Sequence, residues 1–121
     1  MIIIDSFGWI EYLVDGPKAQ AYEKYLMKPA NIITPTIVLY EVYKKVRRHR
    51  KESEALIIYA QMLKTKIVDL TADIARNAAE LSLKFSLPMA DAIVYATAKK
   101  ENCKVITSDP HFKNLPGVIY L

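Results

Sequence analysis

The sequence predicts an α/β protein built around a parallel sheet that helices cover on both faces. Short apolar runs such as Ile2-Ile3-Ile4 alternate along the chain with longer segments of helical periodicity, which is the pattern of strand–helix–strand units. The runs are apolar at consecutive positions rather than at every second one, as in strands buried on both faces. Right-handed crossovers would then place the helices on the two sides of the sheet, whereas strand order does not follow from periodicity.

Each predicted element has a recognisable beginning and end. The predicted strands are Ile2–Ile4, Asn31–Thr34, Ile67–Leu70, Lys104–Thr107 and Val118–Tyr120. The predicted helices are Ser6–Val14, Lys18–Met27, Thr36–Arg50, Ser53–Leu63, a segment capped by Thr71 that reaches Phe85, and Ala90–Lys100. Asp15-Gly16-Pro17 ends the first helix, Lys28-Pro29 the second and Leu87-Pro88 the fifth, because proline and glycine interrupt helical hydrogen bonding.

Size and composition favour one domain that spans residues 1–121. Of the 121 residues, 52% are hydrophobic, which is enough for a single core. The apolar run before Asp5 is too short for a signal peptide, and no segment approaches the roughly 20 apolar residues of a membrane span. Cys103 is the lone cysteine, so no internal disulfide can form, and we expect it to pack as a small hydrophobe. We therefore expect a cytoplasmic protein that does not bind membranes.

Four carboxylates lie where apolar segments begin or end. Asp5 closes the first strand and Asp109 follows the fourth, Asp91 opens the last helix, and Glu41 lies within the helix that follows the second strand. In alternating strand–helix proteins, ligand sites form beyond the carboxyl ends of the parallel strands. The predicted topology therefore permits all four acids to converge on one crevice.

Each acid also has a simpler explanation when it is taken alone. Asp5 can cap the helix that starts near Ser6, and Asp109 before Pro110 has the pattern of a helix N-cap. Asp91 near a helix start gains from the helix dipole. Glu41 can lie on a solvated helix face. The sequence leaves both explanations open for each residue.

If the acids converge, electrostatics predicts what fills the site. Two unit charges about 4 Å apart repel by roughly 4 kcal/mol at an effective dielectric constant near 20, so such a cluster raises pKa values or recruits a cation. Oxygen ligands suit Mg²⁺ or Mn²⁺, whereas His49 and His111 lack Cys or His partners at zinc-ligand spacing. Metal-assisted phosphodiester hydrolysis is the corresponding chemistry. The hydroxyls beside the acids, of Ser6, Thr107 and Ser108, can orient a carboxylate, a water or a phosphate oxygen, or simply cap helices.

A basic run directly follows Glu41. It extends from Lys44 to Lys51, and the formal net charge of +4 permits a polyanionic partner without requiring one. The candidate nucleic-acid contacts in it are Lys44, Lys45, Arg47 and Arg48. They can contact a nucleic-acid backbone or form a solvated helix face. The nearby tyrosines, Tyr40, Tyr43 and Tyr59, can stack on bases or, as their helical spacing favours, pack in the core or an interface.

Four blocks of the sequence, in this order and spacing, resemble PIN-domain ribonucleases, and more narrowly the VapC-type toxins of toxin–antitoxin pairs. They are Met1–Ile10, with an apolar strand, Asp, a hydroxyl residue and Trp; Thr34–Glu41; Leu87–Ala98; and Val105–Phe112. The resemblance covers essentially all 121 residues.

The resemblance implies a three-layer α/β/α fold with a five-stranded parallel sheet. It implies that Asp5, Glu41, Asp91 and Asp109 are catalytic, metal-binding acids, with Ser6 and Thr107 as supporting hydroxyls. It further implies an endoribonuclease that uses Mg²⁺ or Mn²⁺, forms a homodimer and is neutralised by a small antitoxin whose arm enters the acidic groove. Phe7 departs from the small polar residue that the family often has there, so a supporting contact is expected to be missing.

Two other functions remain as alternatives. One is a PIN-like module that binds RNA or a protein partner but cleaves slowly or not at all; Phe7 favours it and the intact acids oppose it. The other is a phospho-acceptor switch or phosphatase on a similar fold. Such proteins need paired acids or Asp-x-Asp after the first strand, whereas Asp5 is followed by Ser6 and Phe7.

Overall fold

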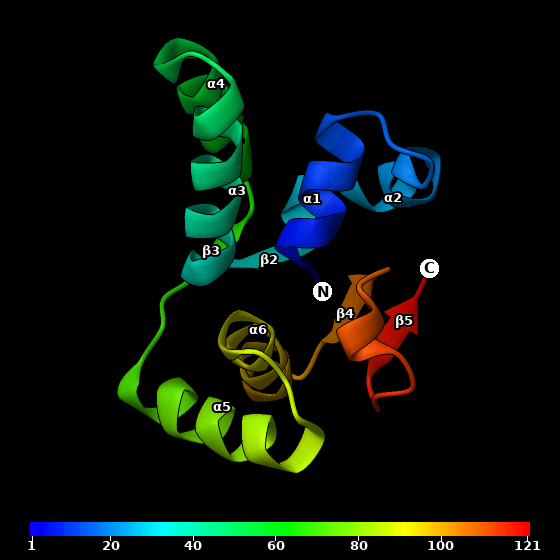
Figure 1. The fold of residues 1–121 in the computed structure, drawn as a ribbon, viewed down its shortest axis with the longest axis vertical. Coiled ribbons are helices and arrows are strands. Elements are labelled where there is room, and N and C mark those ends of the chain that lie inside the picture. The colour runs from blue at the N-terminus through cyan, green and yellow to red at the C-terminus, as the bar shows by residue number, and fades with distance from the viewer.

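The computed structural model describes residues 1–121 and has a sheet of five parallel strands in the order β3-β2-β1-β4-β5 (Figure 1). The strands are β1 (Ile2–Ile4), β2 (Ile32–Pro35), β3 (Lys66–Val68), β4 (Lys104–Thr107) and β5 (Val118–Tyr120). The first strand of the sequence is thus the central strand of the sheet. The predicted α/β class with a five-stranded parallel sheet is confirmed.

Six helices connect the strands, and each of their ends lies within one residue of the predicted position. They are α1 (Ser6–Leu13), α2 (Ala19–Leu26), α3 (Thr36–His49), α4 (Glu52–Met62), α5 (Ala72–Phe85) and α6 (Met89–Lys100), with short 3-10 turns at Pro29–Asn31 and Pro110–Phe112. Figure 1 shows α1 and α2 on one side of the sheet and α5 and α6 on the other, the arrangement that right-handed crossovers give. None of the helices combines the length and the apolar character needed to cross a bilayer.

The third strand ends earlier than its composition predicts. The apolar run predicts a strand over Ile67–Leu70, but β3 covers Lys66–Val68, and Leu70 is exposed. This edge strand pairs only with β2, with Pro35 opposite Val68. Because β2 ends at Pro35, the following residues of β3 have no partner and lead into the Thr71 cap of α5.

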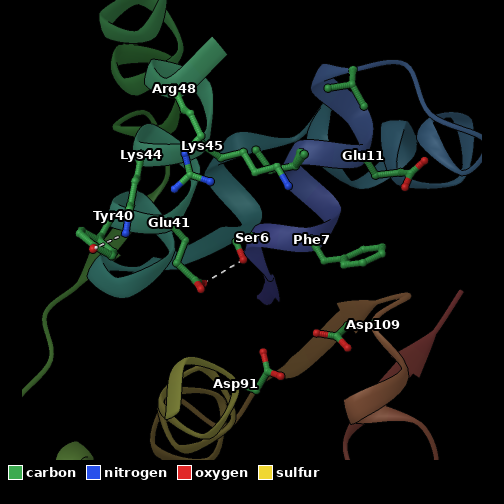
Figure 2. A pocket seen from close by; sticks show the side chains of 12 residues that line it. Ser6, Phe7, Glu11, Tyr40, Glu41, Lys44, Lys45, Arg48, Asp91 and Asp109 are labelled. Atoms are coloured by element: carbon green, nitrogen blue, oxygen red, sulfur yellow. Dashed lines mark hydrogen bonds between the residues drawn. The ribbon is translucent and has the colours of Figure 1, made fainter. Parts of the chain in front are cut away.

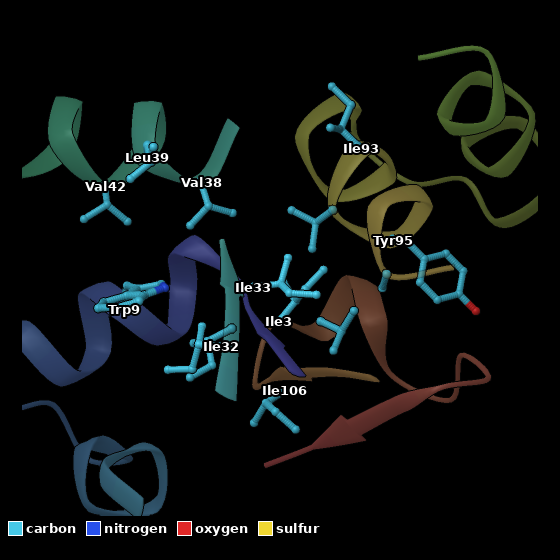
Figure 3. Packing of buried hydrophobic residues seen from close by; sticks show 14 of the residues in the cluster. Ile3, Trp9, Ile32, Ile33, Val38, Leu39, Val42, Ile93, Tyr95 and Ile106 are labelled. Carbon is cyan, nitrogen blue, oxygen red and sulfur yellow. The ribbon is translucent and has the colours of Figure 1, made fainter. Parts of the chain in front are cut away.

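The core lies between the sheet and the helices on both of its faces (Figure 3). The central strands contribute isoleucines and a valine that are at most 2% exposed: Ile3, Ile4, Ile32, Ile33, Val105 and Ile106. Strands buried on both faces explain why these runs are continuously apolar. Cys103 is only partly buried at the edge of this core, so its packing is looser than predicted.

The topology brings the ends of separate segments to one edge of the sheet. Ile4 of β1 pairs with Ile106 of β4, so Asp5, which follows β1, lies beside Thr107, the last residue of β4. Helix α3 begins directly after β2, and α6 contacts both β1 and β4. The candidate acids lie on these four elements.

Candidate active site

Asp5 is the most buried of the four acids, with 2% of its surface exposed. One carboxylate oxygen accepts a hydrogen bond of 3.0 Å from the backbone N–H of Gly8, so Asp5 caps α1. The other accepts a hydrogen bond of 2.7 Å from Thr107 Oγ1 at the end of β4. Helix capping and a place in the acidic cluster are therefore compatible roles of the same side chain.

Burial raises the pKa of Asp5 from 3.8 to about 7. The hydrogen bonds from Thr107 and Gly8 oppose this shift, while the neighbouring charges of Asp109 and Asp91 add to it. The carboxyl group is therefore held at the border between its neutral and ionised forms near neutral pH, a feature common at functional sites.

Asp91 and Asp109 face one another at the mouth of the site. Asp91 lies in the first turn of α6, and Asp109 follows β4 and caps the 3-10 turn by accepting a hydrogen bond of 3.0 Å from the His111 N–H. The backbone N–H of Asp109 in turn donates to Thr107 Oγ1 at 2.9 Å. Thr107 thus fixes the positions of two acids through one hydroxyl group.

The pKa of Asp91 is raised from 3.8 to about 6. Burial is the largest cause, and the charges of Asp109 and Glu41 raise it further, while His111 lowers it. The pKa of Asp91 is therefore raised by acids from two other segments of the fold, as expected in a cluster of carboxylates.

Glu41 reaches the site from the second turn of α3. Its Oε1 accepts a hydrogen bond of 2.8 Å from Ser6 Oγ at the start of α1. The side chain is therefore held against another element and does not lie free on a solvated helix face.

The acids surround a cavity of about 540 Å³ (Figure 2). Glu41, Asp91 and Asp109 line it, and Lys44, Lys45 and Arg48 line it from the exposed side of α3. Its other lining residues are Ser6, Phe7, Ile10, Glu11, Val14 and Tyr40. Asp5 lies beneath this surface, joined to it through Thr107. The cavity thus combines negative charge at the sheet edge with positive charge along α3.

The basic run lines more than one hollow. Arg47 does not line the acidic cavity, but it lines a neighbouring hollow together with Arg48, Tyr43 and Tyr59. Those two rings pack edge to face with centroids 5.8 Å apart, as the packing explanation predicted. Tyr40 is 58% exposed and faces the acidic cavity, where its hydroxyl accepts a hydrogen bond from Lys44.

Phe7 lies on the rim of the cavity and is 44% exposed. Figure 2 shows its ring on the side nearest Asp109. The neighbouring residue, Ser6, donates its hydroxyl hydrogen bond to Glu41. The Phe7 side chain has no polar atom, so it offers the acids no hydrogen bond.

His111 is a component of the site that sequence reasoning missed. Its Nδ1 lies 3.0 Å from Asp91 Oδ2 and 3.1 Å from Asp109 Oδ1. Zinc-ligand spacing concerns Cys and His partners, whereas the partners of His111 are carboxylates. The available signal was its position two residues after Asp109, inside the turn that Asp109 caps.

Two tyrosines that no sequence motif singled out support the loop that carries Asp109. Tyr22 is fully buried, and its hydroxyl is 2.7 Å from Ser108 Oγ. Tyr120 donates to the Ser108 carbonyl at 3.2 Å.

The Tyr22 ring packs so closely on Gly8 that a Cβ there would lie 2.5 Å from it, so a glycine is required at this point.

The donor set fits a divalent cation. One donor atom each from Asp91, Asp109 and His111 can be chosen so that all lie within 4.8 Å of one another, and the Glu41 carboxylate lines the same cavity. Carboxylate oxygens suit Mg²⁺ and Mn²⁺, and the mutual repulsion of the acids favours a positive ion among them.

Comparisons with known proteins identify the family and the fold. The PIN domain family model matches residues 2–118, whereas no curated protein matches the sequence. The fold is similar to that of a toxin–antitoxin complex from Klebsiella pneumoniae, at 23% identity and a TM-score of 0.81, over 98% of this chain and 96% of that chain. It is also similar to VapBC2 from Rickettsia felis bound to a promoter DNA fragment (21% identity, TM-score 0.77, 100% and 98% covered).

A third similar structure is VapC20 from Mycobacterium tuberculosis, a toxin described as cleaving the sarcin–ricin loop. It has 18% identity and a TM-score of 0.72 over 87% of each chain. At these identities the structures establish a shared fold, and the family model matches nearly the whole sequence. The chain belongs to the PIN domain family.

Proposed function

We propose that this protein is a metal-dependent endoribonuclease, the toxin of a VapBC-type toxin–antitoxin pair, which hydrolyses RNA phosphodiester bonds. The observation that carries the proposal is the composition of one cavity. Glu41, Asp91 and Asp109 line it, Asp5 lies beneath it, and a row of cations from α3 borders it. Hydrolysis of a phosphodiester needs both groups of residues. The cations attract the negatively charged backbone, and the acids would hold an ion that stabilises the charge at the reacting phosphate.

Glu41, Asp91 and Asp109 would hold Mg²⁺ or Mn²⁺, with Asp5 adding negative charge from below. When bound, such an ion lowers the pKa of a coordinated water and shields the charge of the phosphodiester. The chain itself keeps the acids in position: Thr107 holds Asp5 and the Asp109 backbone, and Ser6 holds Glu41. Ser6 and Thr107 are therefore positioning residues.

The RNA backbone would lie along α3. Lys44, Lys45 and Arg48 provide positive charge on the cavity wall, and Arg47 extends it toward the neighbouring hollow. Phe7 and Tyr40 expose aromatic rings on the same cavity, and unpaired bases stack on such rings. Single-stranded RNA is the substrate that satisfies both contacts.

The partner would be a small antitoxin protein, and the active form a homodimer in the cytoplasm. Structures similar in fold include a toxin–antitoxin complex and VapBC complexes bound to DNA. An arm of the antitoxin would enter the acidic cavity, where it would compete with the metal for the carboxylates and block access of the RNA. An antitoxin would thus inhibit by occupying the site itself.

Cleavage of a defined single-stranded RNA by the purified chain tests this proposal. We expect cleavage with Mg²⁺ or Mn²⁺, none with chelator, and none with Asp91→Asn, since an amide does not supply an anionic ligand. Glu80→Gln is a matched control, because it removes one carboxylate from an exposed position of α5 outside the cavity. Equal cleavage by wild type and Asp91→Asn would refute the proposal.

The alternative function, a PIN-like module that binds RNA or protein without appreciable cleavage, is favoured only by Phe7. It predicts that metal and RNA bind while the RNA stays intact. The same assay distinguishes the two functions, provided that RNA binding is measured alongside cleavage.

A further inference from the structure

We infer that His111 is a nitrogen ligand of the divalent ion, so that the site has a mixed nitrogen and oxygen donor set and prefers transition-metal ions to Mg²⁺. This inference rests on the proposed function, because it concerns the same ion. It adds a residue that neither the four-acid pattern nor the family match assigns. Its starting point is the position of His111 Nδ1 between two carboxylates of the cavity.

The distances around His111 are those of neighbouring ligands on one ion. Nδ1 lies 3.0 Å from Asp91 Oδ2 and 3.1 Å from Asp109 Oδ1. Adjacent ligands of an octahedral ion with bonds near 2.1 Å are about 3 Å apart. The three donors come from α6, from the loop after β4 and from the 3-10 turn, so the fold brings Asp91 to the local pair of Asp109 and His111.

The backbone fixes the place from which the imidazole projects. The His111 N–H donates to Asp109 Oδ1 at 3.0 Å in the capped turn. The imidazole then contacts the same pair of acids from this 3-10 turn. Removing the imidazole leaves the backbone hydrogen bond intact, so a substitution can separate ligation from the positioning of Asp109.

An imidazole changes which ion the site prefers. Mg²⁺ is bound by oxygen ligands, whereas imidazole suits later first-row metals, and affinity for nitrogen-containing sites rises from Mn²⁺ to Co²⁺. Loss of a nitrogen ligand should therefore weaken the binding of Co²⁺ most, that of Mn²⁺ less and that of Mg²⁺ least. A histidine that served only as a positive counter-charge to the acids would instead oppose all three ions.

Calorimetric titration of the chelator-treated full chain with each of the three ions tests the inference. For His111→Ala we expect a loss of Mn²⁺ affinity of about tenfold or more, a larger loss for Co²⁺, and less than about threefold for Mg²⁺. His49→Ala is the matched control, because His49 is exposed at the end of α3 and does not line the acidic cavity. Equal losses for the three ions, or a gain of affinity for all of them, would overturn the inference.

Pulsed electron paramagnetic resonance of the Mn²⁺-loaded chain gives a direct second readout. A coordinated imidazole produces nitrogen modulation that changes when histidine alone is labelled with ¹⁵N. We expect this signal in wild type and His49→Ala and its loss in His111→Ala. Bound Mn²⁺ without nitrogen modulation would overturn the His111 assignment and leave the proposed nuclease intact, whereas failure of Mn²⁺ to bind would overturn both.

Discussion

The acids and the cations of the cavity differ in how firmly the fold holds them. Asp5 is 2% exposed and hydrogen bonded on both carboxylate oxygens, and Glu41 and Asp109 also have partners on fixed elements. Lys45 and Arg48, by contrast, project from the exposed face of α3. A metal ion requires ligands at defined positions, whereas a polyanion requires only nearby positive charge. We therefore expect steep effects of substitutions among the acids and graded effects among the cations.

After Asp91→Asn, the largest effect on cleavage is expected for Asp5→Asn. Cleavage should fall by about a hundredfold or more, because metal-ion catalysis supplies several kcal/mol of transition-state stabilisation. The metal-free protein should nevertheless become more stable at pH 8, by about 1 to 3 kcal/mol, since a buried charge is removed. Urea denaturation and a cleavage assay measure the two quantities. An Asp5→Asn variant that is both active and less stable would show that Asp5 serves the fold alone.

The stability of the metal-free chain should fall as the pH rises from about 4 to 7. Folding raises the pKa of Asp5 from 3.8 to about 7 and that of Asp91 to about 6. The folded state therefore binds more protons than the unfolded state between about pH 4 and 7, and stability falls as the pH rises through this range. The contribution of Asp5 amounts to at most about 4 kcal/mol.

Mg²⁺ should reverse this loss, because it binds the ionised carboxylates, so its affinity should rise over the same pH range. Thermal denaturation from about pH 4 to 8, with and without Mg²⁺, measures both trends. Substitution of Lys45 by Met should leave the shape of the pH profile unchanged. A profile that is flat between about pH 4 and 7 would contradict the prediction that buried acids are held at a cost in stability.

A smaller effect is expected when the acids keep their charge but lose their support. Thr107→Val removes the hydrogen bonds to Asp5 and to the Asp109 N–H, and should destabilise the fold by about 2 to 3 kcal/mol. Metal affinity should fall about tenfold or more. Thr107→Ser keeps the hydroxyl and is the matched control, so equal metal affinity of the Val and Ser variants would indicate that the hydroxyl does not position the acids.

The smallest effect is expected on the basic side, where two neighbouring arginines provide an internal comparison. Arg48 lines both the acidic cavity and the next hollow, whereas Arg47 lines the next hollow but not the acidic cavity. Arg48→Ala should weaken binding of single-stranded RNA a few-fold and lower the slope of log affinity against log salt by about 0.7. Arg47→Ala should change both quantities less. Fluorescence anisotropy on metal-free protein measures binding without cleavage. Identical salt slopes for wild type and Arg48→Ala would indicate that the basic residues of α3 form only a solvated helix face.

Local patterns in the sequence were sufficient to locate the elements and to nominate the acids. Periodicity is a local property, so apolar runs and helical stripes located all five strands and six helices, with β4 and β5 at their predicted bounds. Asp5 and Asp109 were nominated from an equally local feature, which is their position shortly after a strand. The end of β3 could not be predicted from local sequence, because it depends on where its partner β2 ends at Pro35.

Which side chains meet depends on the tertiary structure. The Ser6–Glu41 contact joins residues 35 positions apart, and the Thr107–Asp5 contact joins residues 102 positions apart. The place of His111 between Asp91 and Asp109 depends on how α6 packs against the sheet. The packing of α3 likewise decides that Arg48 lines the acidic cavity and Arg47 does not. Repeats of two or 3.6 residues specify which face of an element is apolar, whereas the direction from which one element meets another follows from the packing of the whole core.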